Sequence, residues 1–285
     1  MKRLLLIITM IAALIPAVNA QKQKIVKARV MTFNIRTLNS GDGVNNWEMR
    51  FHKVGAFINK SKADIVGMQE VQPLQLRDME SVLTDYGYVG QPRDDGKEQG
   101  EYTPIFYNKE KYNVLRSGTF WLSPTPQEPS YGWDAACRRI ATWAILQEKA
   151  TLKSLIVLNT HLDHVGEQAR VNSAALIKER VGRMSNELPV VIIGDMNSED
   201  RDPAYAKMMT SIFTMQDAYK AVRKVSGPTY TFPDFGQLAD DKRPKIDYIF
   251  LSSQIKVNKA TVHNSALGNG FYLSDHNALT ADIAF

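Results

Sequence analysis

Six short stretches of this sequence place polar residues at the boundaries of apolar, strand-like runs. Their side chains are carboxylates, amides and imidazoles, the groups that bind a hard metal ion and move protons. In chain order they are Asn34 in TFNIR, Glu70 in MQE, His161 in NTHL, Asp195 and Asn197 in GDMN, Asp247 in IDYIF, and Asp275 and His276 in SDH. Because α/β folds commonly place their chemistry at the rim of a sheet, this pattern predicts one shared site.

Each of these residues also has an ordinary structural explanation. Asn34 fits a turn, Glu70 a helix cap, Asp247 a salt bridge and His161 a satisfied core imidazole. Asp195 follows the buried run VVII and fits a turn as well, since Asp bonds its own backbone. Polar residues of the same kind at six strand boundaries favour a site over six separate explanations.

The elements that must position these residues are strands and helices in mixed order. Alternation or continuous apolar character predicts strands at 25–35, 63–69, 103–108, 112–122, 140–147, 154–162, 189–195, 245–251 and 255–262. Apolar residues at three and four spacing, or a leading proline, predict helices at 47–60, 73–83 and 167–186. Segments 91–101 and 123–134 are polar and predicted to be exposed loops. This mixture predicts an α/β sandwich in which helices cover packed sheets.

Composition limits the function without identifying it. The chain has 285 residues, with 35 Lys and Arg against 30 Asp and Glu, scattered along the chain rather than gathered in a basic stripe. This mild excess identifies no nucleic-acid partner. Cys137 is the only cysteine, so no intrachain disulfide can form. Without an internal repeat or a linker between two cores, residues 21–285 are predicted to form a single domain.

Residues 1–20 are predicted to be a signal peptide. Lys2 and Arg3 give a basic start, an apolar centre follows, and Ala20 fits a cleavage site. The alternative is an uncleaved anchor, although the apolar centre is short for a membrane span. The mature protein is therefore expected to be exported to the periplasm or the extracellular space, without stable membrane insertion. The sequence indicates no protein partner.

The six motifs, in this order, resemble those of the endonuclease/exonuclease/phosphatase superfamily. The chain looks like a secreted, bacterial-type member of that superfamily. The resemblance runs from about residue 28 to the C-terminus. It implies an α/β fold of the deoxyribonuclease I-like kind, a four-layer sandwich of two packed β-sheets flanked by helices. It also implies a divalent metal and a phosphate ester at the rim of the sheets.

The resemblance assigns roles to the motif residues. Glu70 is implied to be the main Mg²⁺ ligand, with Asn34 and Asp275 beside it and Mn²⁺ as an alternative ion. The implied catalytic residues are His161, Asp195, Asn197, Asp247 and His276. In the chemistry we predict, water attacks phosphorus, His276 is the general base held by Asp247, and Asp195 and Asn197 orient the water and the phosphoryl group.

Two further assignments rest on the same resemblance. Glu101, which precedes the strand-like run TPIFYN, is placed where the family pairs a Glu with the counterpart of His161. Arg139 resembles a phosphate-contacting Arg of the family, and its planar fork suits two phosphate oxygens. A surface Arg on an edge strand is the alternative. His52, His164 and His263 match no motif.

The sequence thus predicts a secreted, metal-dependent phosphoesterase that hydrolyses a phosphodiester by attack of water. The expected partner is a phosphate-ester substrate, with nucleic acid among the candidates. The alternatives are a sugar or inositol phosphate phosphatase, and a catalytically inactive member that binds phosphorylated ligands. Trp121, Tyr131 and Trp133, around a proline-rich loop, fit either a platform for bases or simple loop packing.

Overall fold

The structure, a computed structural model, describes residues 24–285, so the predicted signal peptide lies outside the described residues. The first sheet contains β1 (Lys27–Asn34), β2 (Ile65–Gln69), β3 (Tyr86–Val89), β4 (Ile105–Asn108), β11 (Lys256–His263) and β14 (Ala278–Ala284). The second contains β5 (Tyr112–Trp121), β6 (Ile140–Glu148), β7 (Ser154–His161), β8 (Val190–Asp195), β9 (Met215–Asp217) and β10 (Asp247–Ser252). A small hairpin adds β12 (Ala266–Gly268) and β13 (Phe271–Tyr272).

The helices are α1 (Trp47–Ser61), α2 (Pro73–Val82), α3 (Glu167–Ser185), α4 (Pro203–Thr210) and α5 (Ala218–Ala221), with short 3₁₀ turns at Ser40–Asn45 and Asp240–Lys242. Local chemistry sets where the first helices begin. The Asn46 side chain caps α1 by accepting from the Met49 N–H. Pro73 opens α2, and the side chains of Gln72 and Gln75 form a reciprocal capping box there.

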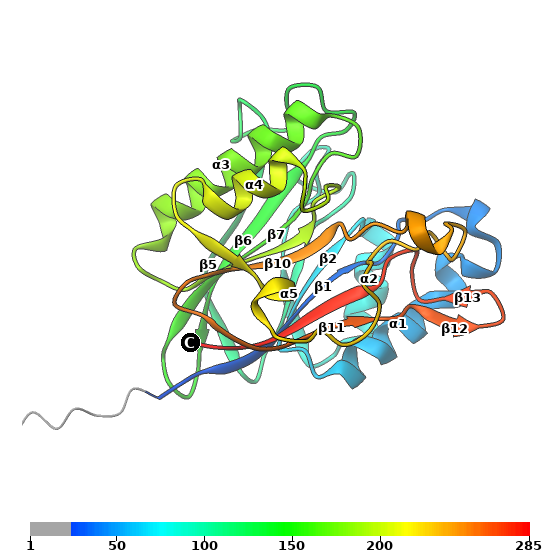
Figure 1. Ribbon diagram of the computed structural model, residues 1–285, viewed down its shortest axis with the longest axis horizontal. Coiled ribbons are helices and arrows are strands. Elements are labelled where there is room, and N and C mark those ends of the chain that lie inside the picture. Colours follow the sequence, from blue (N-terminus) through cyan, green and yellow to red (C-terminus); the bar gives the residue numbers. More distant parts are fainter. Residues whose placement is uncertain (1–23) are drawn as a thin grey trace, which may run out of the picture.

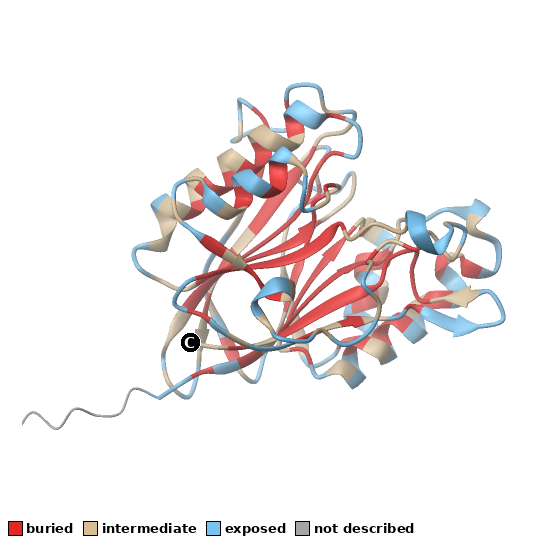
Figure 2. Cartoon of the chain, viewed as in Figure 1, coloured by how far each residue is buried: buried red, intermediate tan, exposed pale blue. Residues whose placement is uncertain are grey.

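The strand order is β11-β14-β1-β2-β4-β3 in the first sheet and β5-β6-β7-β8-β10-β9 in the second. The two sheets pack face to face, with α1 and α2 outside the first and α3 and α4 outside the second (Figure 1). Burial follows these layers: the central strands are buried along most of their length, the edge strands β3, β5 and β11 are largely intermediate or exposed, and the outer faces of the helices are exposed (Figure 2). This is the predicted four-layer α/β sandwich, which the structure confirms.

Each interface between layers has its own apolar cluster. Val30 and Ile65 of the first sheet meet Ile193 and Ile249 of the second in the central cluster. The sheets lie close together at Gly67, where a Cβ atom would lie 2.5 Å from Ile193 Cδ1. A side chain at this position would therefore separate the two sheets just below the rim.

Strand pairing brings the predicted site residues to one rim. β1 and β2 run parallel, so Asn34 lies opposite Gln69, the residue before Glu70. In the second sheet, Asp195 at the end of β8 lies beside His161 of β7 and Asp247 of β10. Five strands, β1, β2, β7, β8 and β10, thus bring polar residues at or beside their ends to a single place.

The predicted strands and helices are all present, and the structure adds elements that the sequence patterns did not indicate. These are β3, β9, the β12–β13 hairpin, β14, α4 and α5. β14 lies between β1 and β11, where its ALTADIA sequence keeps only Asp282 and Ala284 partly exposed. Within residues 24–285, no helix has the length and apolarity needed to cross a membrane.

Candidate active site

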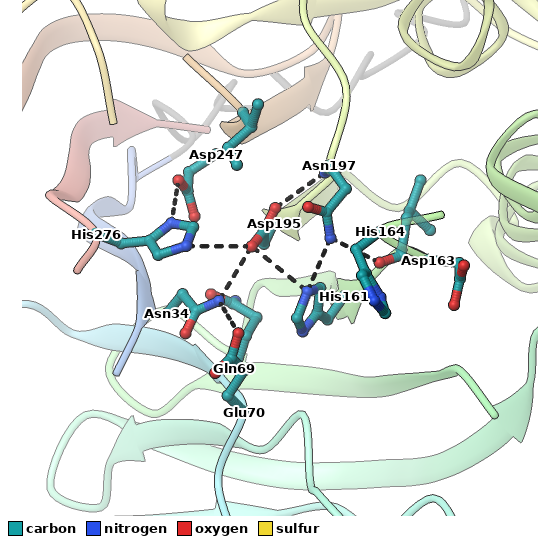
Figure 3. A network of polar contacts seen from close by, with 12 residues as sticks. Asn34, Gln69, Glu70, His161, Asp163, His164, Asp195, Asn197, Asp247 and His276 are labelled. Atoms are coloured by element: carbon teal, nitrogen blue, oxygen red, sulfur yellow. Dashed lines mark hydrogen bonds and ion pairs between the residues drawn. The ribbon is translucent and has the colours of Figure 1, made fainter. Parts of the chain in front are cut away.

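Asp195 lies at the centre of the polar network at the rim (Figure 3). Its Oδ2 accepts a hydrogen bond of 3.0 Å from Asn34 and lies 3.5 Å from His161 Nε2 and 3.6 Å from His276 Nε2. Gly194 makes this position possible: its φ is +152°, and a Cβ there would meet the Thr160 carbonyl oxygen at 2.0 Å. The glycine thus lets β8 run close beside β7 and present Asp195 at the strand end.

Glu70 follows β2 in the left-handed region, with a φ of 63°. Its Oε1 accepts from Asn34 Nδ2 at 3.0 Å and its Oε2 accepts from the Thr37 backbone N–H at 2.8 Å. Burial would raise the pKa of Glu70, but the hydrogen bond from Asn34 and the charge of His276 outweigh it and lower that pKa. Glu70 is therefore an ionised carboxylate held in a strained backbone position, as ligands and catalytic groups often are.

His276 is held by Asp247, whose Oδ2 lies 2.9 Å from His276 Nδ1. The Phe232 ring covers the imidazole at a centroid distance of 4.8 Å. Burial opposes protonation, yet the charges of Asp247 and Asp195 raise the pKa of His276 to about 10. The imidazolium form is thus favoured at neutral pH. This does not favour the general-base role predicted for His276, because the base would already carry its proton.

Two other carboxyl groups of the site resist ionisation. Burial, followed by the charge of Asp247, raises the pKa of Asp195 to about 7. Burial also raises the pKa of Asp275 to about 6; its Oδ1 accepts from the Ser274 hydroxyl and its Oδ2 lies 3.5 Å from Arg36. Burial disfavours the charged form of both carboxyl groups. A bound cation would favour this charged form, so these carboxyl groups suit a cation site.

His161 contacts Asn197, whose Nδ2 lies 2.9 Å from His161 Nε2 and also donates to the Leu162 carbonyl oxygen. Asn197 has a φ of 44°, and its N–H donates to Asp195 Oδ1. Burial, followed by the charge of Arg139, lowers the pKa of His161 well below its usual value. His161 is therefore neutral. Its Nδ1 is buried and has no hydrogen-bond partner among the described residues.

Arg139 precedes β6 and is 5% exposed, so it is a buried residue and not a surface Arg. Its Nε donates to Asp163 Oδ2 at 3.2 Å, and its Nη2 lies 2.9 Å from His164 Nδ1. Asp163 also accepts backbone N–H groups from Ala136, Cys137, Val165 and Gly166. Although burial opposes it, these hydrogen bonds lower the pKa of Asp163. Arg139 is thereby held in one orientation by a fixed carboxylate.

Glu101 does not make the predicted pair with His161. Its Oε2 accepts instead from Arg93 Nη1 at 2.6 Å, and both residues line the same pocket as His161. The physical reason lies in residues 91–101: the backbone N–H of Arg93 donates to the Glu101 carbonyl oxygen, so the two side chains face each other. Glu101 is therefore already paired.

Asn34 also differs from the predicted metal ligand. Its NH₂ group faces Glu70 and Asp195, while its carbonyl oxygen accepts from the Arg36 backbone N–H. In this orientation Asn34 holds two carboxylates together as a donor and does not present its oxygen to a metal. Asp195, Asp247 and His276 form a further compact group, each offering one ligand atom within 4.8 Å of the others.

These residues surround a pocket of about 420 Å³. Seven residues of its lining were not predicted as site residues, and three of these carry guanidinium or imidazole groups, namely Arg36, Arg93 and His164. Arg36 is the last residue of TFNIR, and His164 follows NTHL closely. Their positions in or beside a motif could have identified both as site residues. Nothing in the polar segment around Arg93 distinguished it from a solvated loop charge.

The Endonuclease/Exonuclease/phosphatase family model matches residues 31–276, which span every motif residue named above. The chain belongs to this family. An endonuclease/exonuclease/phosphatase from Bacteroides vulgatus is 45% identical, with a TM-score of 0.87 over 90% of this chain and 98% of that chain. A mannosyl-6-phosphatase from Bacteroides thetaiotaomicron is 31% identical, with a TM-score of 0.85 over 90% of this chain and all of that one.

More distant solved structures share the fold alone. TDP2 from D. rerio, solved with a single-strand DNA product, is 18% identical with a TM-score of 0.70 over 90% of this chain and 98% of that chain. Two curated relatives, both uncharacterized proteins of Acanthamoeba polyphaga mimivirus, are 30% and 26% identical. These matches cover 55% and 56% of this chain, but only 62% and 28% of the relatives' own lengths.

Proposed function

We propose that the protein is an exported phosphoric ester hydrolase that uses a divalent metal and water. The observation that carries this is the arrangement around Asp195, where a paired imidazolium, an ionised Glu70 and a neutral His161 meet in one pocket. Family membership supports hydrolysis of a phosphate ester. Export rests on the leader at residues 1–20, and metal use rests on the donor set.

The residues present fit a hard divalent cation. Glu70 offers an ionised carboxylate, and Asp275 offers a second carboxyl group whose charged form a bound cation would favour, while Asn34 fixes Glu70 relative to Asp195. Mg²⁺ takes oxygen ligands and usually only one or two protein carboxylates. Bound there, the ion would offset the negative charge that builds on the phosphoryl oxygens in the transition state.

The chain's own groups then divide the remaining chemistry. Asp195, with a pKa of about 7, is matched to accept the proton of the attacking water near neutral pH. His276, oriented by Asp247, donates a hydrogen bond from Nε2 to a phosphoryl oxygen as an imidazolium. Asn197 orients His161 on the opposite side of Asp195. Arg139, held by Asp163, presents its guanidinium to the phosphate.

The alcohol part of the substrate separates two candidates. The sequence predicts a phosphodiester. The second candidate is a sugar phosphate monoester, and it is favoured by the 31% identity to a mannosyl-6-phosphatase over that chain's whole length. A pocket of about 420 Å³ suits a small phosphate ester.

The test is phosphate or alcohol release from a panel of esters by the purified mature protein. The panel contains a hexose 6-phosphate, an inositol phosphate, bis(p-nitrophenyl) phosphate, a dinucleotide and single-stranded DNA, each with Mg²⁺, with Mn²⁺ and with chelator. We expect metal-dependent hydrolysis of at least one class. Binding of these esters without turnover of any, under all three conditions, would instead support the inactive, ligand-binding alternative.

A further inference from the structure

One wall of the pocket carries a charged pair that the chemistry above does not use. Glu101 Oε2 accepts from Arg93 Nη1 at 2.6 Å, and the two side chains are only 14% and 17% exposed. Both residues line the pocket together with Glu70 and His161. An ion pair with this degree of burial costs desolvation free energy, so its presence in a wall beside the reacting groups calls for an explanation.

The wall is fixed relative to the metal-binding side of the site. The Arg93 N–H donates to the Glu101 carbonyl oxygen at 3.0 Å, and the buried Trp121 indole donates to the Arg93 carbonyl oxygen at 2.7 Å. Tyr102, the residue after Glu101, exchanges backbone hydrogen bonds with Val71, the residue after Glu70. The pair therefore has a set position beside Glu70.

The pair has spare hydrogen-bonding capacity of both kinds. Neither Arg93 Nη2 nor Glu101 Oε1 makes a hydrogen bond to another described residue. A guanidinium only donates and a carboxylate only accepts, whereas a hydroxyl group does both. Two neighbouring hydroxyl groups of one ligand can therefore satisfy the pair together, one against each partner.

The charges argue against other ligands at this wall. Because Glu101 neutralises Arg93, the pair carries little net charge to attract a second phosphate. Among the described residues that line the pocket, Phe232 is the only Phe, Tyr or Trp, and its ring packs on His276. Trp121 is 5% exposed beneath Arg93, so it offers no open face to a nucleobase. An apolar headgroup or acyl chain would cover the remaining hydrogen-bonding groups of both side chains without satisfying them.

We propose that Arg93 and Glu101 bind the leaving alcohol, and that this alcohol is a polyol with neighbouring hydroxyl groups, as in a sugar phosphate. This inference rests on the proposed phosphoesterase function and names its substrate class. Specificity then arises because an ester without hydroxyl groups leaves buried polar atoms unpaired.

The test compares mannose 6-phosphate with phenyl phosphate, whose leaving group carries no neighbouring hydroxyl groups. The variants are Arg93→Met and Glu101→Gln, and the matched controls are Lys97→Met and Glu98→Gln in the same loop, whose side chains are exposed. With Mg²⁺, we expect each pocket variant to lower kcat/KM for mannose 6-phosphate about 10- to 100-fold, chiefly through KM. The loss on phenyl phosphate should be at least about tenfold smaller, and the controls should match wild type on both esters.

Equal losses on the two esters would overturn the inference, because they indicate a role in the chemical step or in folding; the thermal midpoint of each variant separates these two. Unchanged kcat/KM on mannose 6-phosphate would overturn it as well. If wild type hydrolyses neither ester, calorimetric binding of both compounds to wild type and Arg93→Met decides. Tighter binding of mannose 6-phosphate that is lost in the variant keeps the polyol site and rejects only the hydrolysis; equal affinities reject the polyol site.

Discussion

One amide group, that of Asn34, joins the rims of the two sheets. Its Nδ2 donates to Glu70 Oε1 and to Asp195 Oδ2, each at 3.0 Å, so a residue of β1 fixes carboxylates that follow β2 and end β8. Two carboxylates from different sheets are thereby bound to the same amide group. We expect this shared donor to set the distance between the cation-binding carboxylate and the proposed base.

Asn34→Ala removes the shared donor, and Asn34→Asp replaces it with a third negative charge. We expect kcat to fall by about 10²-fold or more in both variants, because misplaced reacting groups cost that much. Metal affinity should fall more in Asn34→Ala, since Asn34→Asp supplies an additional carboxylate. Metal titration measures the affinity, and turnover measures kcat. Asn113→Ala, at an exposed position of β5, is the control. Normal turnover in Asn34→Ala would show that other contacts position the carboxylates.

Asn159 links the two sheets beneath the rim. Its Oδ1 accepts from Gln69 Nε2 at 2.6 Å, and its Nδ2 donates to the carbonyl oxygens of Met68 and Pro104. Asn159→Ala removes these three buried hydrogen bonds and opens a cavity beside Gly67. We expect a loss of about 2 to 4 kcal/mol in the free energy of unfolding by urea. A loss below about 1 kcal/mol would mean that the sheets do not depend on this bond.

Lys178, which lies outside the active site, is expected to make the stability of the folded protein depend on pH. Its buried ammonium group donates to the carbonyl oxygens of Met208 and Phe213, and burial lowers its pKa from 10.5 to about 8. Between these values the unfolded chain binds more protons than the folded one, so the contribution of Lys178 to stability rises with pH.

We expect the free energy of unfolding of wild type, relative to Lys178→Met, to increase by about 1 to 3 kcal/mol as the pH rises through this window. Below it, the full penalty for burying the charge is present. Denaturant titrations of the two proteins at several pH values measure the difference. A difference that stays constant with pH would mean that Lys178 keeps an ordinary pKa when folded.

Export is tested on protein from the native cell. The leader predicts a mature chain that begins at or near Gln21 and is recovered outside the cytoplasm. N-terminal sequencing and cell fractionation measure this, with Ala20→Arg as the variant expected to block processing. Cytoplasmic protein with an intact Met1 would contradict the prediction.

The site residues at the ends of the buried strands could be predicted from the sequence, because a buried strand has a clear apolar signature. The run VVII stops at Gly194 and Asp195, and pairing with β7 and β10 then places His161 and Asp247 beside them. The walls had no such signature. Arg93 comes from a polar loop, and its contact with Glu101 depends on a backbone turn that no periodicity indicates.

The protonation states of the site residues also could not be predicted from sequence patterns. The protonated state of His276 depends on the charges of Asp247 and Asp195, which are distant in the chain and adjacent in space. Trp121 was considered as a platform for bases, but it is buried beneath Arg93, because β5 continues to Trp121 before the loop starts. β14 was missed since its short, mostly apolar run lies between β1 and β11 and has no clean alternation.

The most direct test of the account is turnover of a phosphate ester that wild type hydrolyses, measured for wild type and Asp195→Asn with Mg²⁺ and with excess chelator. Thermal midpoints are measured on the same samples. We expect chelator to abolish wild-type turnover and Asp195→Asn to lower kcat about 10²- to 10⁴-fold without loss of the fold. Full hydrolysis in chelator, or near-normal turnover in Asp195→Asn at an unchanged midpoint, would contradict a metal-dependent mechanism centred on Asp195.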